Sequence, residues 1–143
     1  MVAMALYMCG SPAGPEAVMT PLGETLRLLR DRKGVSQKEM AAGIGVSPAY
    51  LSALEHGRRG APSFDLLQRI AGYFNIIWDE VDDLFRVAGH SDPRVTVDTA
   101  GLSPRHTLLA NLLARDIGTL PESAVEKMLE ILRDTAERPE NRQ

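Results

Sequence analysis

The side chains of this chain best suited to chemistry are basic ones, which concentrate in a single stretch. Arginine and lysine form charge-assisted hydrogen bonds to phosphate oxygens, so such a cluster favours nucleic-acid binding. The stretch from 27 to 69 holds eight basic and four acidic residues, although the whole chain has a net charge of −3. The basic residues are Arg27, Arg30, Arg32, Lys33, Lys38, Arg58, Arg59 and Arg69. Acidic residues gather further along, at 79–83, so we expect a locally positive face. An ordinary solvated mixture of charges is the alternative.

Catalytic and metal-binding chemistries have no comparable support. No nucleophile, base and orienting acid stand at a recognisable spacing, and no glycine-rich phosphate loop follows a predicted strand. Cys9 is the single cysteine, which excludes an internal disulfide. The histidines His56, His90 and His106 lack the spacing of zinc ligands. We therefore expect no enzyme activity, no cofactor and no metal, and a location in the reducing cytoplasm.

Residues 37–56, QKEMAAGIGVSPAYLSALEH, predict two short helices joined at a glycine. The inward positions are Met40, Ala41 and Ile44 on the first helix, and Leu51 and Leu54 on the second. Ser47 and Pro48 suit the N-cap and the first position of the second helix. Gly45 can adopt a left-handed backbone conformation where the chain reverses, and Ala41 is small enough for the helices to cross closely. An ordinary helical hairpin in an unrelated core is the alternative.

The segment from about Leu22 to Leu84 resembles the helix-turn-helix domain of the Cro/phage-repressor (XRE) family. Beyond the helix pair, PLGETLRLLRDRKGVSQ resembles the family's first helix, EHGRRGAPS its basic loop, and FDLLQRIAGYFNIIWDEVDDL its closing helices. The resemblance implies an all-α fold whose DNA-binding domain, residues 19–89, has five helices. It also implies a transcription regulator that binds double-stranded DNA as a homodimer.

The resemblance assigns roles around the second helix of the pair, which would enter the major groove as the recognition helix. Gln37 would meet a phosphate at the start of the first helix. Ser47 would cap the recognition helix, with or without a contact to the DNA backbone. The residues expected to contact DNA are Gln37, Lys38, Ser47, Pro48, Ala49, Tyr50, Ser52, Ala53, His56, Arg58 and Arg59.

The chain departs from better-known phage repressors at positions that often carry amide side chains for reading bases. Pro48, Ala49 and Ala53 stand there, and none has a side-chain hydrogen-bonding group. The remaining means of readout are apolar contacts with thymine methyl groups, Tyr50 reaching a base edge or a phosphate, and DNA shape. We expect modest discrimination per half-site, compensated by dimerisation or cooperative binding.

Several residues of the domain are expected to hold the structure rather than DNA. Arg30 and Glu55 match family positions that form an ion pair between the first helix and the end of the recognition helix. Gly57 is a candidate left-handed C-cap before the basic loop. The predicted N-caps are Thr20, followed by Pro21, and Ser63. The predicted core residues of the closing helices are Leu66, Leu67, Ile70, Ala71, Phe74, Trp78, Val81 and Leu84.

The parts outside the domain carry weaker signals. Residues 1–18 are a poorly specified leader that is too short to span a bilayer. Met19 could be the true start of translation, or residues 1–7 could form a strand or clip that packs on a partner. Residues 90–103 read as a linker with a possible short strand at 94–98, which could pair with a copy of itself or with the body.

Residues 104–136 predict a C-terminal helical hairpin, followed by a tail at 137–143. Two helices alone cannot bury two leucine-rich stripes, so a further surface is needed. Packing on the DNA-binding domain is one solution, and dimerisation into a four-helix arrangement is the preferred one. The expected dimerisation residues are Leu108, Leu109, Leu112, Leu113, Ile117, Val125, Met128, Leu129 and Leu132.

Two classes of function remain open on the sequence. The first is a dimeric transcription regulator, in the cytoplasm and nucleoid-associated when DNA-bound, acting as a repressor or as an activator that contacts RNA polymerase. The second is an interaction protein, such as an antitoxin or adaptor, whose C-terminal helices hold another protein. No membrane association is expected.

Overall fold

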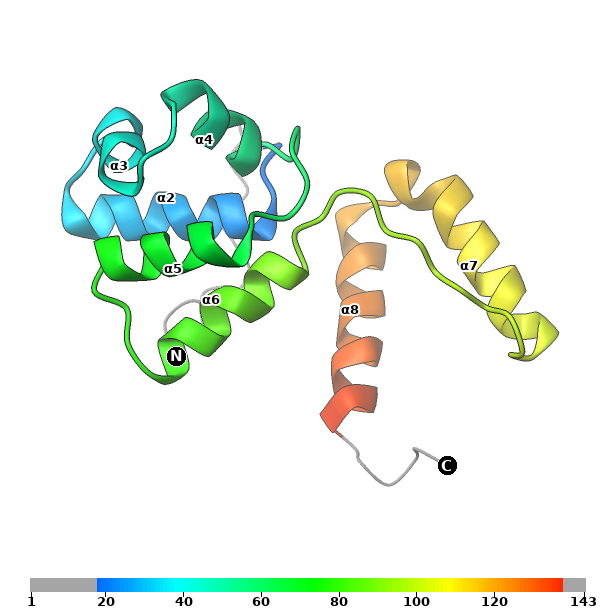
Figure 1. Cartoon of the computed structure of the whole chain (residues 1–143). Helices are drawn as coiled ribbons and strands as arrows, with labels where there is room; N and C mark the ends of the chain where they lie inside the picture. Colours follow the sequence, from blue (N-terminus) through cyan, green and yellow to red (C-terminus); the bar gives the residue numbers. More distant parts are fainter. Residues whose placement is uncertain (1–17, 138–143) are drawn as a thin grey trace. The chain divides into compact units, whose positions relative to one another are not determined.

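The computed structural model describes residues 18–137, which form helices and loops without a strand (Figure 1). The chain divides into two compact units, Met1–Val95 and Thr96–Gln143. The first contains α2 (Pro21–Lys33), α3 (Gln37–Ile44), α4 (Pro48–Glu55), α5 (Phe64–Tyr73) and α6 (Asp79–Gly89). The second contains α7 (Pro104–Asp116), the short 3-10 helix η1 (Ile117–Thr119) and α8 (Glu122–Glu137). The all-α class is confirmed. The count of five helices in the domain stays a prediction, because residues 1–17, with nearly all of the expected leader, lie outside the description, as does the tail at 138–143.

Helices of the first unit begin at residues whose side chains cap the first turn. Thr20 caps α2, its side-chain oxygen accepting from the backbone N–H of Gly23 at 3.1 Å, and Pro21 is the first helical residue. Ser63 caps α5 in the same way through Leu66 N–H at 3.2 Å. Both predicted N-caps are confirmed. Each cap satisfies a backbone donor that has no partner inside the helix, which stabilises the first turn by about 1 kcal/mol.

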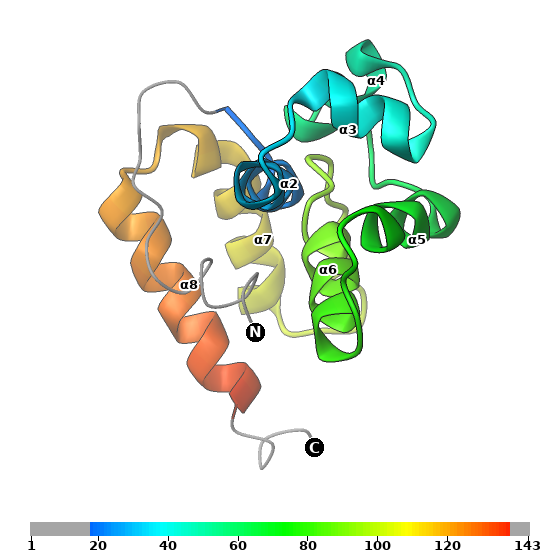
Figure 2. The same ribbon diagram turned by 90° about the vertical axis from the view of Figure 1, so that its left-hand side faces the viewer.

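The core of the first unit lies between all of its described helices. α3 and α4 cover one side of α2 and α5, and α6 packs against α2 and α5 on the other side (Figures 1 and 2). The buried apolar residues are Leu22, Leu26, Met40, Ala41, Ile44, Leu51, Leu54, Leu66, Leu67, Ile70, Ala71, Leu84, Val87 and Ala88. Burial of each large aliphatic side chain contributes about 1.5–3 kcal/mol, so this core rigidly supports α4 from behind. The predicted inward positions of α3 and α4 are confirmed.

The start of α2 touches the end of α4 so closely that only glycine fits between them. A Cβ atom on Gly23 would lie 2.2 Å from the carbonyl oxygen of Glu55. The same carbonyl accepts the backbone N–H of Thr20 at 3.0 Å. Sequence reasoning gave Gly23 no role, because the contact joins residues more than thirty positions apart. It fixes where α4 ends relative to α2.

Ser91, just beyond α6, ties the two ends of the first unit together. Its buried hydroxyl accepts the backbone N–H of Leu22 at 2.8 Å and donates to the carbonyl of Val87. Ser91 thus packs with the first unit, which extends to Val95, and the predicted linker bounds of 90–103 stay a prediction.

Trp78 is not a core residue, so that prediction was wrong. Its side chain is 82% exposed, and its backbone has φ 55°, in the left-handed region that disfavours bulky residues. The inward face of α6 instead begins at Val81, which is half-buried against the core, and continues through Leu84, Val87 and Ala88, at helical spacing. The positive φ at the residue before α6 takes Trp78 off that face.

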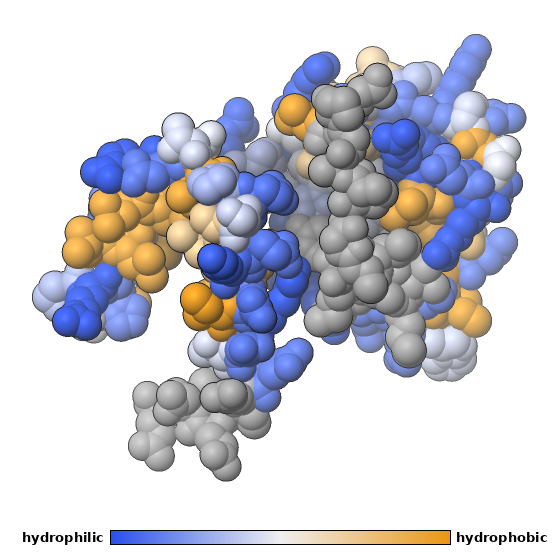
Figure 3. Space-filling view, turned by 180° about the vertical axis from the view of Figure 1, so that it is seen from behind, coloured by the Kyte–Doolittle hydropathy of each residue, from blue (hydrophilic) through white to orange (hydrophobic). Residues whose placement is uncertain are grey.

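The second unit leaves its apolar stripes open. None of the described residues from 96 to 137 is buried. Seven of the nine predicted dimerisation residues are 37% to 66% exposed, and Val125 and Leu129 are half-buried. Ile131, which the sequence analysis did not include, is also exposed, at 65%. The space-filling view shows a broad apolar patch on this unit (Figure 3).

The region between the units contains none of the expected strand. Residues 94–98 are extended coil, without strand pairing in the described chain. Pairing of this segment with a second copy remains a prediction. Within residues 18–137, no helix combines the length and apolar character needed to cross a membrane. The same residues contain no group of three or more histidine, cysteine or acidic side chains placed to hold a metal ion.

Candidate nucleic-acid interface

α4 begins at the residues that the sequence predicted. Ser47 has an extended backbone, φ −73° and ψ 149°, and its hydroxyl oxygen accepts the N–H of Tyr50 at 3.0 Å. Pro48 is the first helical residue, where its fixed φ suits the helix and its missing N–H costs nothing. The capping role of Ser47 is confirmed.

The turn between α3 and α4 is stabilised by hydrogen bonds of its own backbone and by a side chain from α5. Gly45 has φ 75°, as predicted, and the N–H of Val46 returns to the carbonyl of Ala41 at 3.0 Å. From α5, the guanidinium of Arg69 donates to the carbonyl of Ile44 at 2.8 Å. Arg69 also pairs with Asp65, one turn earlier, at 2.8 Å. Sequence reasoning had placed Arg69 only among the positive charges, but its side chain braces the turn.

The outer face of α4 is lined by small side chains, apart from His56 at the end of the helix. Pro48 and Ala49 are exposed, and Ser52, Ala53 and His56 are half-buried. These positions follow a spacing of three or four residues, which places them on one side of the helix. The opposite side carries the buried Leu51, Leu54 and Glu55. Because the outer side chains are short, the backbone of α4 can approach another surface closely.

An ion pair lies behind α4. The guanidinium of Arg30, on α2, contacts the carboxylate of Glu55, and the two side chains are only 11% and 2% exposed. The side-chain amide of Gln37, at the start of α3, donates to the other carboxylate oxygen at 2.9 Å. Glu55 thus joins α2, α3 and α4. Gln37, which was expected to meet a phosphate, thus has an internal partner that the sequence does not reveal.

The burial of Glu55 affects its acidity. Removal from water raises the pKa of its carboxyl above 4.5, and the Arg30 charge and the Gln37 amide act in the opposite direction. The pair therefore depends on both partners remaining in place, because a lone charge in this position would lack both water and a counter-ion.

The loop after α4 turns back along the helix. Gly57 has φ 72°, which confirms the predicted left-handed conformation, and the N–H of Arg58 returns to the carbonyl of Ala53 at 2.9 Å. Arg58 and Arg59 are exposed. The guanidinium carbon of Arg59 lies over the ring of the half-buried Tyr50, 5.1 Å from its centroid. The Arg59 side chain is thereby held beside α4.

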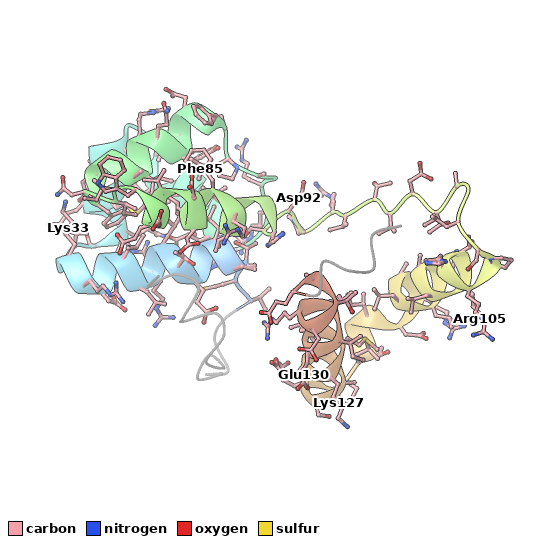
Figure 4. All side chains as sticks on the ribbon, turned by 90° about the horizontal axis from the view of Figure 1, so that it is seen from below. Lys33, Phe85, Asp92, Arg105, Lys127 and Glu130 are labelled. Carbon is pink, nitrogen blue, oxygen red and sulfur yellow. The ribbon has the colours of Figure 1, made fainter. Side chains whose placement is uncertain are left out.

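The basic residues of the unit divide into two groups. Arg30 and Arg69 hold the fold, and Lys33, at the end of α2 (Figure 4), donates to the carbonyl of Tyr73 and lies 4.2 Å from the centre of its ring. The other five basic residues of the stretch from 27 to 69 are all exposed, namely Arg27, Arg32, Lys38, Arg58 and Arg59. The exposed acids Asp79, Glu80 and Asp82 belong to α6, which packs on the side of α2 and α5 away from α4. Fewer cations are available for phosphates than composition suggested, and the acids of α6 lie away from α4.

The residues that form this site are similar in sequence to those of known proteins. The helix-turn-helix family matches residues 26–80, which include α3, the turn and α4. The chain is 38% identical over 94 residues to the HTH-type transcriptional regulator DdrOP3 of Deinococcus deserti, covering 65% of this chain and 64% of that protein. It is 31% identical over 72 residues to the HTH-type transcriptional regulator RghRB of Bacillus subtilis, covering 50% of each. It is 33% identical over 61 residues to the HTH-type transcriptional repressor RghR of the same organism, covering 43% of this chain and 45% of that protein.

The chain thus spans about half the length of the two Bacillus relatives and 64% of the Deinococcus relative. The match includes the residues that form the left-handed turn at Gly45, the cap at Ser47 and the buried pair of Arg30 and Glu55. Residues 26–80 thus match the helix-turn-helix family, and the chain is similar over this region to regulators of the helix-turn-helix type.

Proposed function

We propose that this protein is a sequence-specific regulator of transcription that binds double-stranded DNA as a homodimer, with α4 in the major groove. Its expected location is the cytoplasm, on the nucleoid when DNA-bound. The preferred regulatory role is that of a repressor that blocks access to a promoter. One of the similar proteins is named a transcriptional repressor, which favours this sign of regulation.

The observation that carries the proposal is the contrast between the two sides of α4. Its inner side is fixed by the core and by the buried pair of Arg30 and Glu55, whereas its outer side exposes short side chains. A rigid helix with an unobstructed outer surface fits the major groove, which is wide enough to admit one helix. The exposed Arg58 and Arg59 lie in the following loop, where phosphates beside the groove would be neutralised.

The composition of this outer side sets the kind of readout. Ala49 and Ala53 have methyl groups that suit contact with thymine methyl groups, and Ser52 and His56 offer the polar groups. With few side chains able to form bidentate contacts to bases, a larger share of selectivity comes from DNA shape. Gln37 has its amide committed to Glu55 through one N–H, which leaves the second N–H of that group for a phosphate.

The second unit supplies the reason for a dimer. α7 and α8 expose leucine-rich stripes and bury no residue within the described chain, so an isolated copy lacks a core there. Two copies can bury these stripes against each other as a four-helix arrangement. A symmetric dimer would place two copies of α4 about 34 Å apart, one turn of DNA, on a palindromic site.

The same stripes favour a second candidate function. An exposed apolar surface of this extent also suits another protein, such as a toxin, an assembly partner or RNA polymerase. In that case the C-terminal helices would hold the partner and DNA binding would be secondary.

We expect Leu112→Asp to dissociate the dimer, because it places a charge in the centre of the α7 stripe. At low micromolar concentration the variant should sediment as a monomer. Its affinity for a palindromic duplex should fall about a hundredfold or more, while weak binding to a half-site persists, because the two half-sites no longer act together. Analytical ultracentrifugation and fluorescence anisotropy measure the two effects on the same samples.

Ala114→Asp is the matched control, since Ala114 is exposed on the opposite side of α7 by helical spacing. It should sediment and bind as the wild type does. A wild-type chain that is monomeric at these concentrations, or a Leu112→Asp variant that keeps full affinity for the palindrome, would favour the interaction protein instead.

A further inference from the structure

The ring of Tyr50 and the guanidinium of Arg59 form a pair at the edge of α4. Tyr50 is the third residue of the helix, and its ring packs partly against the core of the first unit. The guanidinium carbon of Arg59 lies 5.1 Å from the centre of this ring, within the range over which a cation is attracted to an aromatic face. Nine positions separate the two residues, so the contact is made by the fold and not by helical spacing.

The backbone after α4 makes the contact possible. The left-handed conformation of Gly57 reverses the chain, and the hydrogen bonds of Gly57 to Leu54 at 3.3 Å and of Arg58 to Ala53 at 2.9 Å fasten the loop to the last turn. Arg59 then reaches back toward the first turn of the same helix. By contrast, no aromatic ring contact is formed by Arg58 among the described residues.

The pair lies beside the proposed DNA-facing side of α4. Tyr50 follows Ala49 directly, so its side chain emerges about 100° around the helix from the exposed Ala49. A guanidinium held there flanks the groove-facing surface, where a DNA phosphate would pass. An exposed arginine normally samples many rotamers, and holding it in one place lowers the entropy lost on binding.

We propose that Tyr50 is a positioning residue for Arg59, so that the two side chains act as one phosphate-binding unit and Tyr50 does not read bases. This inference rests on the proposed DNA binding and deepens it. It replaces the expectation that Tyr50 reaches a base edge. The aromatic ring, rather than the phenolic hydroxyl, is the functional part of Tyr50.

A double-mutant cycle in the full-length protein tests the unit, with a palindromic duplex obtained by selection as the probe. Arg59→Ala should weaken binding about 5- to 10-fold at 0.1 M salt and reduce the salt dependence by about one phosphate contact. Tyr50→Leu, which keeps an apolar contact with the core, should weaken binding about two- to fivefold. In the Arg59→Ala background, Tyr50→Leu should have no further effect. Tyr50→Phe should bind as the wild type, and the order of preference among duplexes should be unchanged in every variant.

Arg58→Ala provides the matched control. The loss of binding affinity that it causes should add to the loss caused by Tyr50→Leu. Additive losses for Tyr50→Leu and Arg59→Ala, or a Tyr50→Phe defect equal to that of Tyr50→Leu, would overturn the inference while leaving the proposed DNA binding intact. A wild-type chain that binds no duplex would overturn both.

A measurement on the free protein examines the pair without DNA and without a destabilising variant. The side-chain protons of Arg59 should show an upfield NMR shift from the Tyr50 ring in the wild type and in Tyr50→Phe. Arg58 protons should resonate at ordinary values. Ordinary values for Arg59 as well would mean that the ring does not hold the guanidinium, which overturns the inference regardless of affinity.

Discussion

Glu55→Ala is expected to lower the free energy of unfolding by about 3–5 kcal/mol, which is the usual cost of breaking a buried ion pair from one side. The carboxylate is 2% exposed, and it is contacted by the guanidinium of Arg30 and the amide of Gln37. Its removal leaves Arg30 with neither a counter-ion nor adequate solvent, and leaves an amide donor without its acceptor. Urea unfolding of the full-length chain, followed by circular dichroism, measures the loss.

Two further variants separate the pair from general effects at glutamate. Glu39→Ala removes an exposed carboxylate that accepts the N–H of Ser36 at 2.6 Å, and it should be much less destabilising than Glu55→Ala. The double variant Arg30→Leu with Glu55→Leu should recover most of the stability, because apolar side chains can replace a buried pair. If Glu55→Ala were no more harmful than Glu39→Ala, α4 would not depend on the pair for its position.

Ala49→Glu should abolish specific DNA binding while the protein remains folded. Ala49 is exposed at the second position of α4, where a carboxylate interacts favourably with the helix dipole, so no loss of stability is expected. On DNA, the new charge would face phosphates and base edges across the groove. Like charges in such an interface cost several kcal/mol, which corresponds to a loss of about a hundredfold or more in affinity.

Ala114→Glu makes the same change of side chain and net charge on α7, on the side opposite its leucine-rich stripe. It should bind DNA with nearly wild-type affinity at 0.15 M salt, where charges farther apart than about 8 Å are largely screened. Equal affinities for the two variants, measured by fluorescence anisotropy, would show that the outer side of α4 is not the surface that binds DNA.

The features that the sequence predicted well are those controlled by neighbouring residues. The caps at Thr20, Ser47 and Ser63 and the left-handed Gly45 and Gly57 depend on bonds within a few positions, so residue type alone identifies them. The inward residues of α3 and α4 follow from helical spacing.

The features that the sequence did not reveal join distant parts of the chain. The roles of Gly23, Arg69 and Gln37 depend on which helices cross, and a basic or amide side chain looks the same whether it braces a turn or faces solvent. Trp78 was assigned to the core because tryptophan is apolar, but the positive φ of its own backbone, at the entry to α6, takes its side chain off the inward face.

In the second unit, the sequence predicts the apolar surface but not the surface that covers it. Its helical stripes can be predicted from the spacing of apolar residues, but the described residues of one copy leave them exposed. Amphipathic spacing indicates that a surface will be buried, whereas the identity of the covering surface depends on a second molecule or another part of the chain.

Selection of bound sequences from a random pool of duplexes by the intact protein tests the central claim most directly. If the outer side of α4 reads the major groove in a dimer, the pool should become enriched in one palindromic motif whose half-sites are centred about one DNA turn, ~34 Å, apart. Ala49→Glu should enrich nothing under the same conditions. Recovery of no motif by the wild type, or of the same motif by Ala49→Glu, would contradict the account.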